Sequence, residues 1–412
     1  MRVAVVSYHS SPVHEPGSGD AGGMTVYVRR LAEALARRGT TTDVFTRATD
    51  ETRSPVVLSP GVRVIPIEAG PRTSLPKDEL PEHLADFTAG IRAFALTQRI
   101  SYDLIHSHYW QSGLTGAELA TSWSVPLVHS HHTLGRVKNR FLASGDDPEP
   151  ALRLAGEDEV ITSADVLVAS TDEEQRQLAC LYGASHDRLK TLHPGVDHAV
   201  FRPLDAAAAR RELGIGDEAM MLFVGRIQRL KGIDLAISAL AELVPALDRP
   251  VRLVVVGGAS GRGGEAEVER LQALATSLQV DDHVSFLGPQ PHDRLPLFYN
   301  AADVVTVCSH SESFGFAALE AHACGTPVVG TAVGGLTHIV RDGRSGFLVE
   351  SRDPSVFAAR LKTLLSDPEL RRDLSHEGVV AAARFSWSET GGKFLELYEC
   401  LVRELSPELC TC

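Results

Sequence analysis

Two glutamates eight residues apart, Glu312 and Glu320, lie in the segment SHSESFGFAALEAHACGTP at 309–327. A Ser-Phe-Gly turn follows the first, and an apolar helical pattern contains the second. The start of a helix presents unpaired N–H groups and the positive dipole end, which favour an anion. One acid precedes the helix and the other lies two turns inside it, so they are not spaced as the acid–base pair of a glycosidase. We expect a ligand with a phosphate and flanking hydroxyls, such as a sugar nucleotide; two ordinary surface acids are the alternative.

Two cations, Arg226 and Lys231, stand five residues apart in FVGRIQRLKG at 223–232. They follow a buried strand that ends in glycine. An arginine fork and a lysine point charge at such a strand end suit a diphosphate. A solvated basic turn is the other interpretation of the same residues.

The segment GSGDAGG at 17–23 contains G-x-G-x-x-G. A dinucleotide fingerprint follows the first strand directly and has an acid at the end of the second strand. Here a loop of ten or more residues intervenes, and Asp43 lies at the start of the second strand. The pattern disfavours nicotinamide or flavin and favours a glycine loop, with Gly22 and Gly23, that approaches a diphosphate. A plain surface loop remains open.

Five histidines follow two neighbouring strands of the predicted sheet: His106 and His108 in LIHSHYWQSG, and His129, His131 and His132 in the next such segment. Histidines at adjacent strand ends could hold zinc. No carboxylate or cysteine completes an obvious ligand set, so we expect no metal. We expect some of them to be packed as neutral core residues, and His132 to reach a cleft as a hydrogen-bond donor.

Short β-branched segments alternate with amphipathic helical patterns along the whole chain, which is typical of parallel sheets covered on both faces. The sequence predicts an α/β protein with two doubly wound, Rossmann-like domains facing a central cleft. We place the break at the Pro-Gly turn in HPGVDHAVFRPLD. The expected units are residues 1–198, residues 199–385, and a C-terminal helix that packs back across the domains, with its tail, at 386–412.

Composition excludes several classes of protein. The 412 residues are 43% hydrophobic and 23% charged, with a formal net charge of −13, which argues against nucleic-acid or anionic-membrane partners. No apolar segment approaches the roughly 18–20 residues of a membrane helix. The six cysteines lack zinc-ligand spacing, and Cys410 and Cys412 are expected in a frayed tail. A strand follows the first methionine without a leader pattern, so we expect a cytoplasmic protein.

Together the E-x7-E pattern of Glu312 and Glu320 and the R-x4-K pattern of Arg226 and Lys231 resemble retaining glycosyltransferases of family 4, which have the GT-B architecture. The resemblance covers nearly the whole chain. Several segments are similar to the group that starts mycothiol synthesis, the D-inositol 3-phosphate N-acetylglucosaminyltransferases, and then to sucrose-phosphate synthase-like enzymes. These segments are SPVHEPGSGDAGGMTVYV, VFTRATD, LPKDELPEHL, LIHSHYWQSG, HHTLGRVKN and FVGRIQRLKG.

The resemblance implies roles for individual residues. Arg226 and Lys231 would neutralise the departing diphosphate, Glu320 would bind the ribose, and Glu312 would lie beside the donor sugar. His132 would lie near the reacting carbon, and base contacts are expected around Gly288–His292. The implied nucleotide-sugar contacts are Gly22, Gly23, Arg226, Lys231, Phe314, Gly315, Phe316 and Glu320. The implied acceptor contacts are His9, Thr25, Lys77, Tyr109, Thr133 and Arg153.

The substrates are less determined than the reaction. The resemblance favours transfer of N-acetylglucosamine from UDP-GlcNAc to 1D-myo-inositol 3-phosphate, without an essential cofactor or metal. Thr25 stands where the family usually has Asn in contact with the acceptor, so a relative that joins a GDP-octose to the thiol of ergothioneine in lincosamide biosynthesis is the alternative. The donor nucleotide is therefore UDP or GDP. A nucleotide-dependent oxidoreductase and a sugar-nucleotide epimerase are the alternatives from other classes, and dimers are common among relatives, which allows a homodimer.

Overall fold

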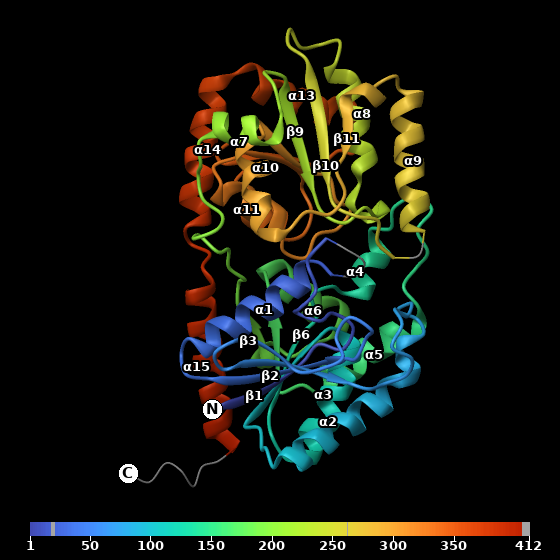
Figure 1. Cartoon of the computed structure of the whole chain (residues 1–412), viewed down its shortest axis with the longest axis vertical. Coiled ribbons are helices and arrows are strands. Elements are labelled where there is room, and N and C mark those ends of the chain that lie inside the picture. Colours follow the sequence, from blue (N-terminus) through green and yellow to red (C-terminus); the bar gives the residue numbers. More distant parts are fainter. Residues whose placement is uncertain (18–20, 262, 406–412) are drawn as a thin grey trace.

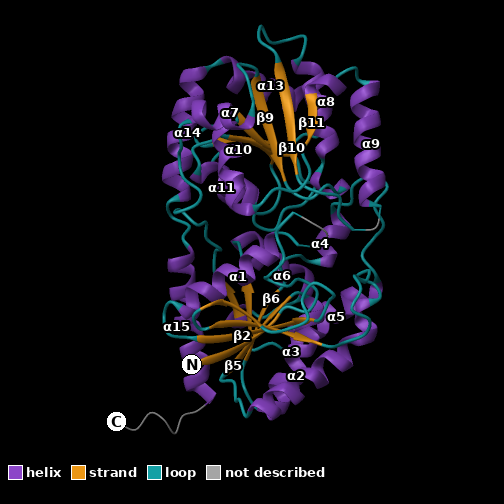
Figure 2. Cartoon of the chain, viewed as in Figure 1, coloured by secondary structure: helices purple, strands orange, loops and turns teal. Residues whose placement is uncertain are grey.

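The computed structural model describes residues 1–17, 21–261 and 263–405. Gly19 of the glycine motif, Cys410 and Cys412 lie outside the described residues. The chain forms two lobes stacked along the long axis of the molecule, each with a central sheet flanked by helices (Figures 1 and 2). The α/β architecture with two sheets that the sequence predicts is confirmed.

The first lobe contains an eight-stranded sheet in the order β3-β4-β2-β1-β5-β6-β7-β8. All neighbours are parallel except β3, which runs antiparallel to β4. Sequence analysis did not identify β3; Val57 in it is 70% exposed, so this edge strand lacks the apolar signal of a buried strand. The strands are β1 (Arg2–Val6), β2 (Thr41–Arg47), β3 (Val56–Ser59), β4 (Val62–Ile67), β5 (Leu104–His108), β6 (Leu127–Ser130), β7 (Val166–Ala169) and β8 (Leu189–Thr191).

The second lobe contains a six-stranded, wholly parallel sheet in the order β11-β10-β9-β12-β13-β14. Its central strands are largely apolar, with β9 wholly so, because helices cover both faces. The strands are β9 (Ala219–Val224), β10 (Val251–Val256), β11 (Val284–Phe286), β12 (Val304–Val307), β13 (Val328–Thr331) and β14 (Gly346–Val349).

Helices lie between most successive parallel strands and flank the two sheets (Figure 2). The α-helices are α1 (Gly23–Ala36), α2 (Leu84–Gln98), α3 (Trp110–Trp123), α4 (Gly135–Arg140), α5 (Ala151–Ser163), α6 (Asp172–Tyr182), α7 (Ala206–Leu213), α8 (Ile233–Leu243), α9 (Gly264–Ser277), α10 (Leu295–Ala301), α11 (Phe316–Ala323), α12 (Leu336–Ile339), α13 (Pro354–Ser366), α14 (Pro368–Ala382) and α15 (Trp387–Leu405). Short 3-10 turns occupy Leu80–His83, His186–Arg188, Arg229–Lys231, Asp281–His283 and His292–Arg294.

The last helix, α15, returns from the second lobe and packs against α1 of the first (Figure 1). Its Phe394 and Tyr398 are fully buried in the same apolar cluster as Tyr27 of α1. The Tyr398 hydroxyl also lies 2.6 Å from Nδ1 of His106 in the middle of β5. One continuous helix therefore connects the second lobe to the sheet that carries the histidines.

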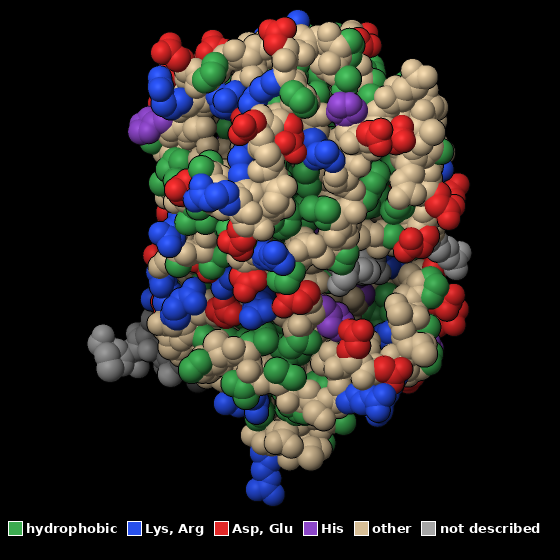
Figure 3. All heavy atoms as spheres, turned by 45° about the horizontal axis from the view of Figure 1, so that its top comes forward, with side chains coloured by type: hydrophobic (Ala, Val, Ile, Leu, Met, Phe, Trp, Pro, Cys, Tyr) green, Lys and Arg blue, Asp and Glu red, His purple; other side chains and the backbone are tan. Residues whose placement is uncertain are grey.

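Charged side chains of both signs are interspersed over the face in Figure 3, which is hollowed between the lobes. This distribution agrees with the acidic net charge and lacks the clustered cations of a nucleic-acid-binding face. Among the helices of the described residues, none combines the length and the apolar character that crossing a bilayer requires.

Candidate active site between the two lobes

A cavity of about 1030 Å³ lies between the lobes, where the carboxyl ends of both sets of strands meet. This is the edge at which open α/β sheets bind ligands. A smaller cavity of about 160 Å³ adjoins it around α11 and the glycine loop. The sequence-predicted residues on the wall of the large cavity are His9, Gly22, Gly23, Lys77, Tyr109, His132, Thr133, Arg153, Arg226, Lys231, Glu312, Phe314, Gly315 and Phe316.

Lys231 and Glu312 form an ion pair across the floor of this cavity, with Nζ 2.6 Å from Oε2. The Ser309 hydroxyl donates to the same carboxylate oxygen at 3.1 Å. The ammonium and the carboxylate are each mostly buried, so their mutual attraction is screened less by solvent and salt than that of a surface pair. Lys231 is thus held beside the start of α11, where a phosphate would meet the ammonium and the positive end of the helix.

Helix α11 begins at the cavity because Gly315 turns the chain with φ +101°. A Cβ at this position would lie 2.9 Å from Cδ2 of Leu336, so glycine is required by both conformation and space. Phe314, Gly315 and Phe316 at the start of α11 all line the cavity. The start of a helix favours an anion, so the anion site that the sequence predicts here stays a prediction at a position open to the cavity.

Glu320 lines the smaller cavity and is 6% exposed. His292 Nε2 lies 3.0 Å from one carboxylate oxygen, and the Tyr299 hydroxyl donates to the other at 2.8 Å. Burial and the nearby carboxylate raise the pKa of Tyr299 well above its usual range, so the hydroxyl stays a donor. The sequence analysis did not predict that His292 and Tyr299 contact Glu320. A buried carboxylate must be hydrogen-bonded, so partners of this kind could have been expected, but not which residues they are.

The glycine loop lies directly against the second lobe. A Cβ on Gly22 would stand 3.1 Å from Nε of Arg226, and one on Gly23 would stand 3.0 Å from Cδ2 of Phe316. Both glycines therefore allow the backbone at the start of α1 to approach the groups expected around a diphosphate.

The structure places Thr25 behind the cavity wall rather than on it. Thr25 is 1% exposed, and its hydroxyl accepts from the Gly22 N–H at 3.3 Å and lies 2.8 Å from the Ser10 hydroxyl. The direct acceptor contact expected for Thr25 is therefore not what this geometry provides. Its hydroxyl instead caps α1 and fixes the glycine loop.

Of the five clustered histidines, His132 lines the cavity. Its backbone is left-handed, with φ +62°, its Nε2 lies 2.9 Å from Nδ1 of His108, and its ring packs edge-on to Tyr27 at 4.8 Å. Burial lowers the pKa of His132 to about 3 and that of His106 likewise to about 3, so both rings are neutral. Within the described residues, no group of three or more potential ligands is arranged to hold a metal ion.

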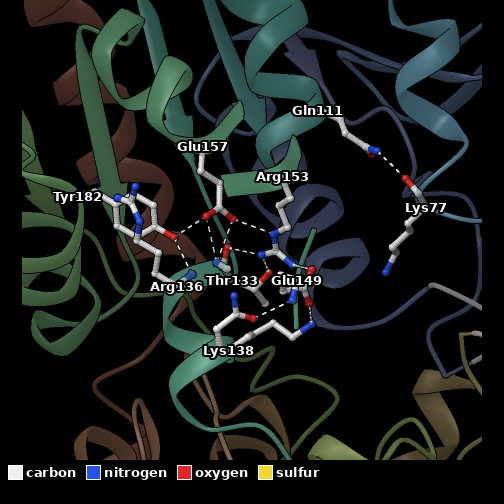
Figure 4. A network of polar contacts seen from close by, with 11 residues as sticks. Lys77, Gln111, Thr133, Arg136, Lys138, Glu149, Arg153, Glu157 and Tyr182 are labelled. Atoms are coloured by element: carbon white, nitrogen blue, oxygen red, sulfur yellow. Dashed lines mark hydrogen bonds and ion pairs between the residues drawn. The ribbon is translucent and has the colours of Figure 1, made fainter. Parts of the chain in front are cut away.

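On the first-lobe wall, Arg153 is 4% exposed and its guanidinium lies 5.0 Å from the centre of the Tyr109 ring. Its Nη2 donates to the backbone oxygen and the hydroxyl of Thr133 at 3.1 and 3.0 Å. The Tyr109 ring also packs on His9 at 4.6 Å. Lys77 lies on the same cavity wall and accepts through its backbone oxygen from Gln111 (Figure 4).

Comparison with known proteins decides the family. Residues 22–195 match the family described as glycosyl transferase 4-like domain, and residues 205–379 match glycosyl transferases group 1. A D-inositol 3-phosphate glycosyltransferase from Acidothermus cellulolyticus is 52% identical over 409 residues, covering 98% of this chain and 91% of the relative. The chain belongs to this glycosyltransferase family. A second relative of that name, from Catenulispora acidiphila, is 48% identical and covers 99% of the chain and 98% of its own length.

Solved glycosyltransferases have the same architecture. Sucrose-phosphate synthase from Thermosynechococcus elongatus superposes with a TM-score of 0.90 at 33% identity, over 97% of this chain and 98% of that one. HepE from Anabaena, solved with UDP and glucose, superposes with a TM-score of 0.78 at 22% identity, over 97% and 100%, and is similar in fold. The glycosyltransferase class and the GT-B fold predicted from the sequence are confirmed.

Lys138 of α4 and Glu149 in the loop that follows also line the glycosyltransferase cavity, and the sequence analysis assigned neither a role. Lys138 Nζ contacts Glu149 Oε1, and Arg153 Nη1 lies 2.8 Å from Glu149 Oε2 (Figure 4). The basic segment GRVKN is evident in the sequence, but the sequence does not show that the Lys138 side chain of this segment faces the cavity. Folding therefore adds a cation and an anion to the predicted acceptor wall.

Proposed function

We propose that this glycosyltransferase moves a sugar from a nucleoside diphosphate to a small anionic acceptor and keeps the anomeric configuration. Our preferred pair is UDP-GlcNAc and 1D-myo-inositol 3-phosphate. One observation carries the proposal: a single cavity joins the Lys231–Glu312 pair at the start of α11 with a second group of cations around Arg153. A donor diphosphate would bind at the first group and an acceptor anion at the second.

The donor half is supported by the charges around α11. Arg226, Lys231 and the helix start would meet the negative charge that develops on the leaving diphosphate, and preorganised groups of this kind contribute strongly to catalysis. Glu320, held by two donors, would accept from ribose hydroxyls. The structures of HepE, similar in fold, are described as complexes with UDP and UDP-glucose, which agrees with a nucleotide-sugar donor.

The proposal that the anomeric configuration is retained is supported by the charge states of Glu312 and His132, which are expected near the reacting carbon. Glu312 is already paired with Lys231, and His132 is neutral, so each is suited to holding sugar hydroxyls. A route in which the leaving phosphate accepts the acceptor's proton on the same face needs no nucleophile from the protein. His132 would then act as a hydrogen-bonding group rather than as a cation.

The acceptor half is supported by the relatives, which are named D-inositol 3-phosphate glycosyltransferases, and by the cations on the first-lobe wall. Arg153 and Lys77 would bind the phosphate of the acceptor, with Tyr109 and Thr133 beside it. A buried guanidinium binds phosphate through paired hydrogen bonds, which a neutral acceptor would not use. Thr25 acts on this wall through the loop that it caps.

The test is a transfer assay with a matrix of donors and acceptors, with products read by mass spectrometry and anomeric configuration by NMR. We expect an α-linked N-acetylglucosaminyl product from UDP-GlcNAc and inositol phosphate, unaffected by a metal chelator. Transfer of a GDP-octose to ergothioneine alone would assign the chain to the sulfur acceptor instead. Interconversion of donors without an acceptor, or an inverted product, would contradict the proposal.

A further inference from the structure

The loop at 141–150, between α4 and α5, places Glu149 inside the cavity. The Glu149 N–H donates to Oδ1 of Asn139 at 2.7 Å, which fixes the backbone at this point. Its carboxylate then spans two cations, contacting Lys138 Nζ with one oxygen and lying 2.8 Å from Arg153 Nη1 with the other (Figure 4). The side chain is 16% exposed and faces the same space as the predicted acceptor.

Arg153 has a bonded partner on each of its three nitrogens. Nε donates to Glu157 Oε1 at 2.8 Å, Nη2 donates to both oxygens of Thr133, and Nη1 meets Glu149. Glu157 is fully buried and accepts from the Gly135 N–H, so it belongs to the frame of the protein. Glu149 and Thr133 both line the cavity, and Glu149 is the charged partner of the two. An anion that pairs with Nη1 of Arg153 from the cavity must therefore take the position of the Glu149 carboxylate.

The charge balance of this wall agrees with such an exchange. Burial and the positive charges of Arg153, Lys77 and Arg226 lower the pKa of Lys138 to about 7. Cations brought this close need an anion between them, and Glu149 supplies one. If an acceptor phosphate entered beside Glu149, two anions would share the site; if it replaced Glu149, the balance would be kept.

The same loop also touches the other lobe. Arg229, which lies between Arg226 and Lys231 in the sequence, donates through Nη1 to the backbone oxygen of Ser144 at 3.0 Å. The segment 144–149 thus connects the cationic turn on the donor side with the acceptor wall. Movement of one lobe against the other would be transmitted to the backbone that carries Glu149.

We propose that Glu149 is a specificity-determining residue, an internal carboxylate that holds the place of the acceptor's anionic group and is displaced by it. The inference rests on the proposed anionic acceptor and deepens it. The wall selects ligands whose anion binds Lys138 and Arg153 better than the tethered carboxylate does. A phosphate, with more charge and more acceptor oxygens than a carboxylate, meets that condition, whereas a neutral acceptor leaves Glu149 in place.

The experiment measures binding of inorganic phosphate by calorimetry at neutral pH, without donor, to the wild type, Glu149→Gln and Glu173→Gln. Glu173 is the matched control, because it lines the same cavity but pairs with Arg176. We expect phosphate to bind Glu149→Gln about tenfold or more tightly than the wild type, since a competing unit charge has been removed. Glu173→Gln should bind as the wild type does. Equal or weaker binding by Glu149→Gln would overturn the proposal.

A second variant tests the proposal if Glu149→Gln fails to fold, which far-UV circular dichroism would show. Glu149→Asp keeps the charge, but it is one methylene too short to span both cations, so phosphate should again bind more tightly than to the wild type. No gain in either folded variant would refute the displacement. Phosphate binding requires no donor and no turnover. The result therefore stands even if the transfer assay with inositol phosphate fails, and the two failures are distinguishable.

Discussion

Because the clustered histidines are buried, we predict that the free energy of unfolding of this protein falls steeply below neutral pH. Burial lowers the pKa of His106, His131 and His132 to about 3 each, and lowers that of His108 and His129 well below the usual range. These rings are neutral in the fold and take up protons only on unfolding. Their contribution to stability is present above the unfolded pKa of about 6.5 and is lost as the pH falls below it.

The size of the effect follows from the proton balance. At about pH 5.5, one such histidine lowers the free energy of unfolding by about 1.4 kcal/mol, and five lower it by about 7 kcal/mol. A domain has about 5–15 kcal/mol in total, so the first lobe should approach its unfolding midpoint in mild acid. Glu174 has the opposite effect, because burial raises its pKa to about 7. Its carboxylate takes up a proton in the folded state as the pH falls below about 7, which offsets the effect of about one histidine on the free energy of unfolding.

The clean test is His131→Leu. His131 is 1% exposed, and neither ring nitrogen has a hydrogen-bond partner among the residues that the structure describes. Leucine has a similar volume and no proton to gain. Between about pH 7.5 and pH 5.5 the variant should lose about 1.4 kcal/mol less than the wild type. Urea unfolding followed by tryptophan fluorescence reports this change, because Trp110 and Trp123 both lie in the first lobe.

The exposed His186, changed to glutamine, serves as the control and should leave the difference between the two pH values as in the wild type. If His131→Leu loses as much stability as the wild type on acidification, the ring is protonated in the fold or solvated. The reasoning from burial would then be refuted for this position.

Four further outcomes are expected from the site. Arg226→Ala should lower kcat by about 10²–10³ if it stabilises the leaving group, as steady-state kinetics would show. Gly23→Ala should cost about 1–3 kcal/mol by overpacking against Phe316, seen as a lower Tm and a higher donor KM. Tyr299→Phe leaves one oxygen of Glu320 without its donor and should cost about 1–3 kcal/mol, measured by thermal unfolding with and without UDP. Chelation with EDTA should leave the transfer rate unchanged, since we expect the donor site to work without a metal; a loss restored by a divalent cation would contradict that expectation.

The sequence alone determined the features that depend on near neighbours. Apolar segments of strand length alternating with helical patterns predicted both sheets, because burial on two faces requires such segments. The helix that begins after Glu312 and contains Glu320 could also be predicted from near neighbours, because a glycine turn and helical spacing set the positions of both acids along the chain. The edge strand β3 was not predicted, because its side chains are partly exposed and a strand of this kind has no clear apolar pattern.

Tertiary structure decided which charged groups meet. Lys231 and Glu312 are 81 residues apart and pair because β9 and β12 are neighbours in the sheet. Arg153 was predicted as a ligand for the acceptor, but the fold gives each of its nitrogens a partner and places Glu149 on its cavity side. The direction of a long side chain is set by packing and charge balance from distant segments. Residue type and spacing therefore identified Lys231, Glu312 and Arg153, whereas only the fold determined their pairing and brought Lys138 and Glu149 into the site.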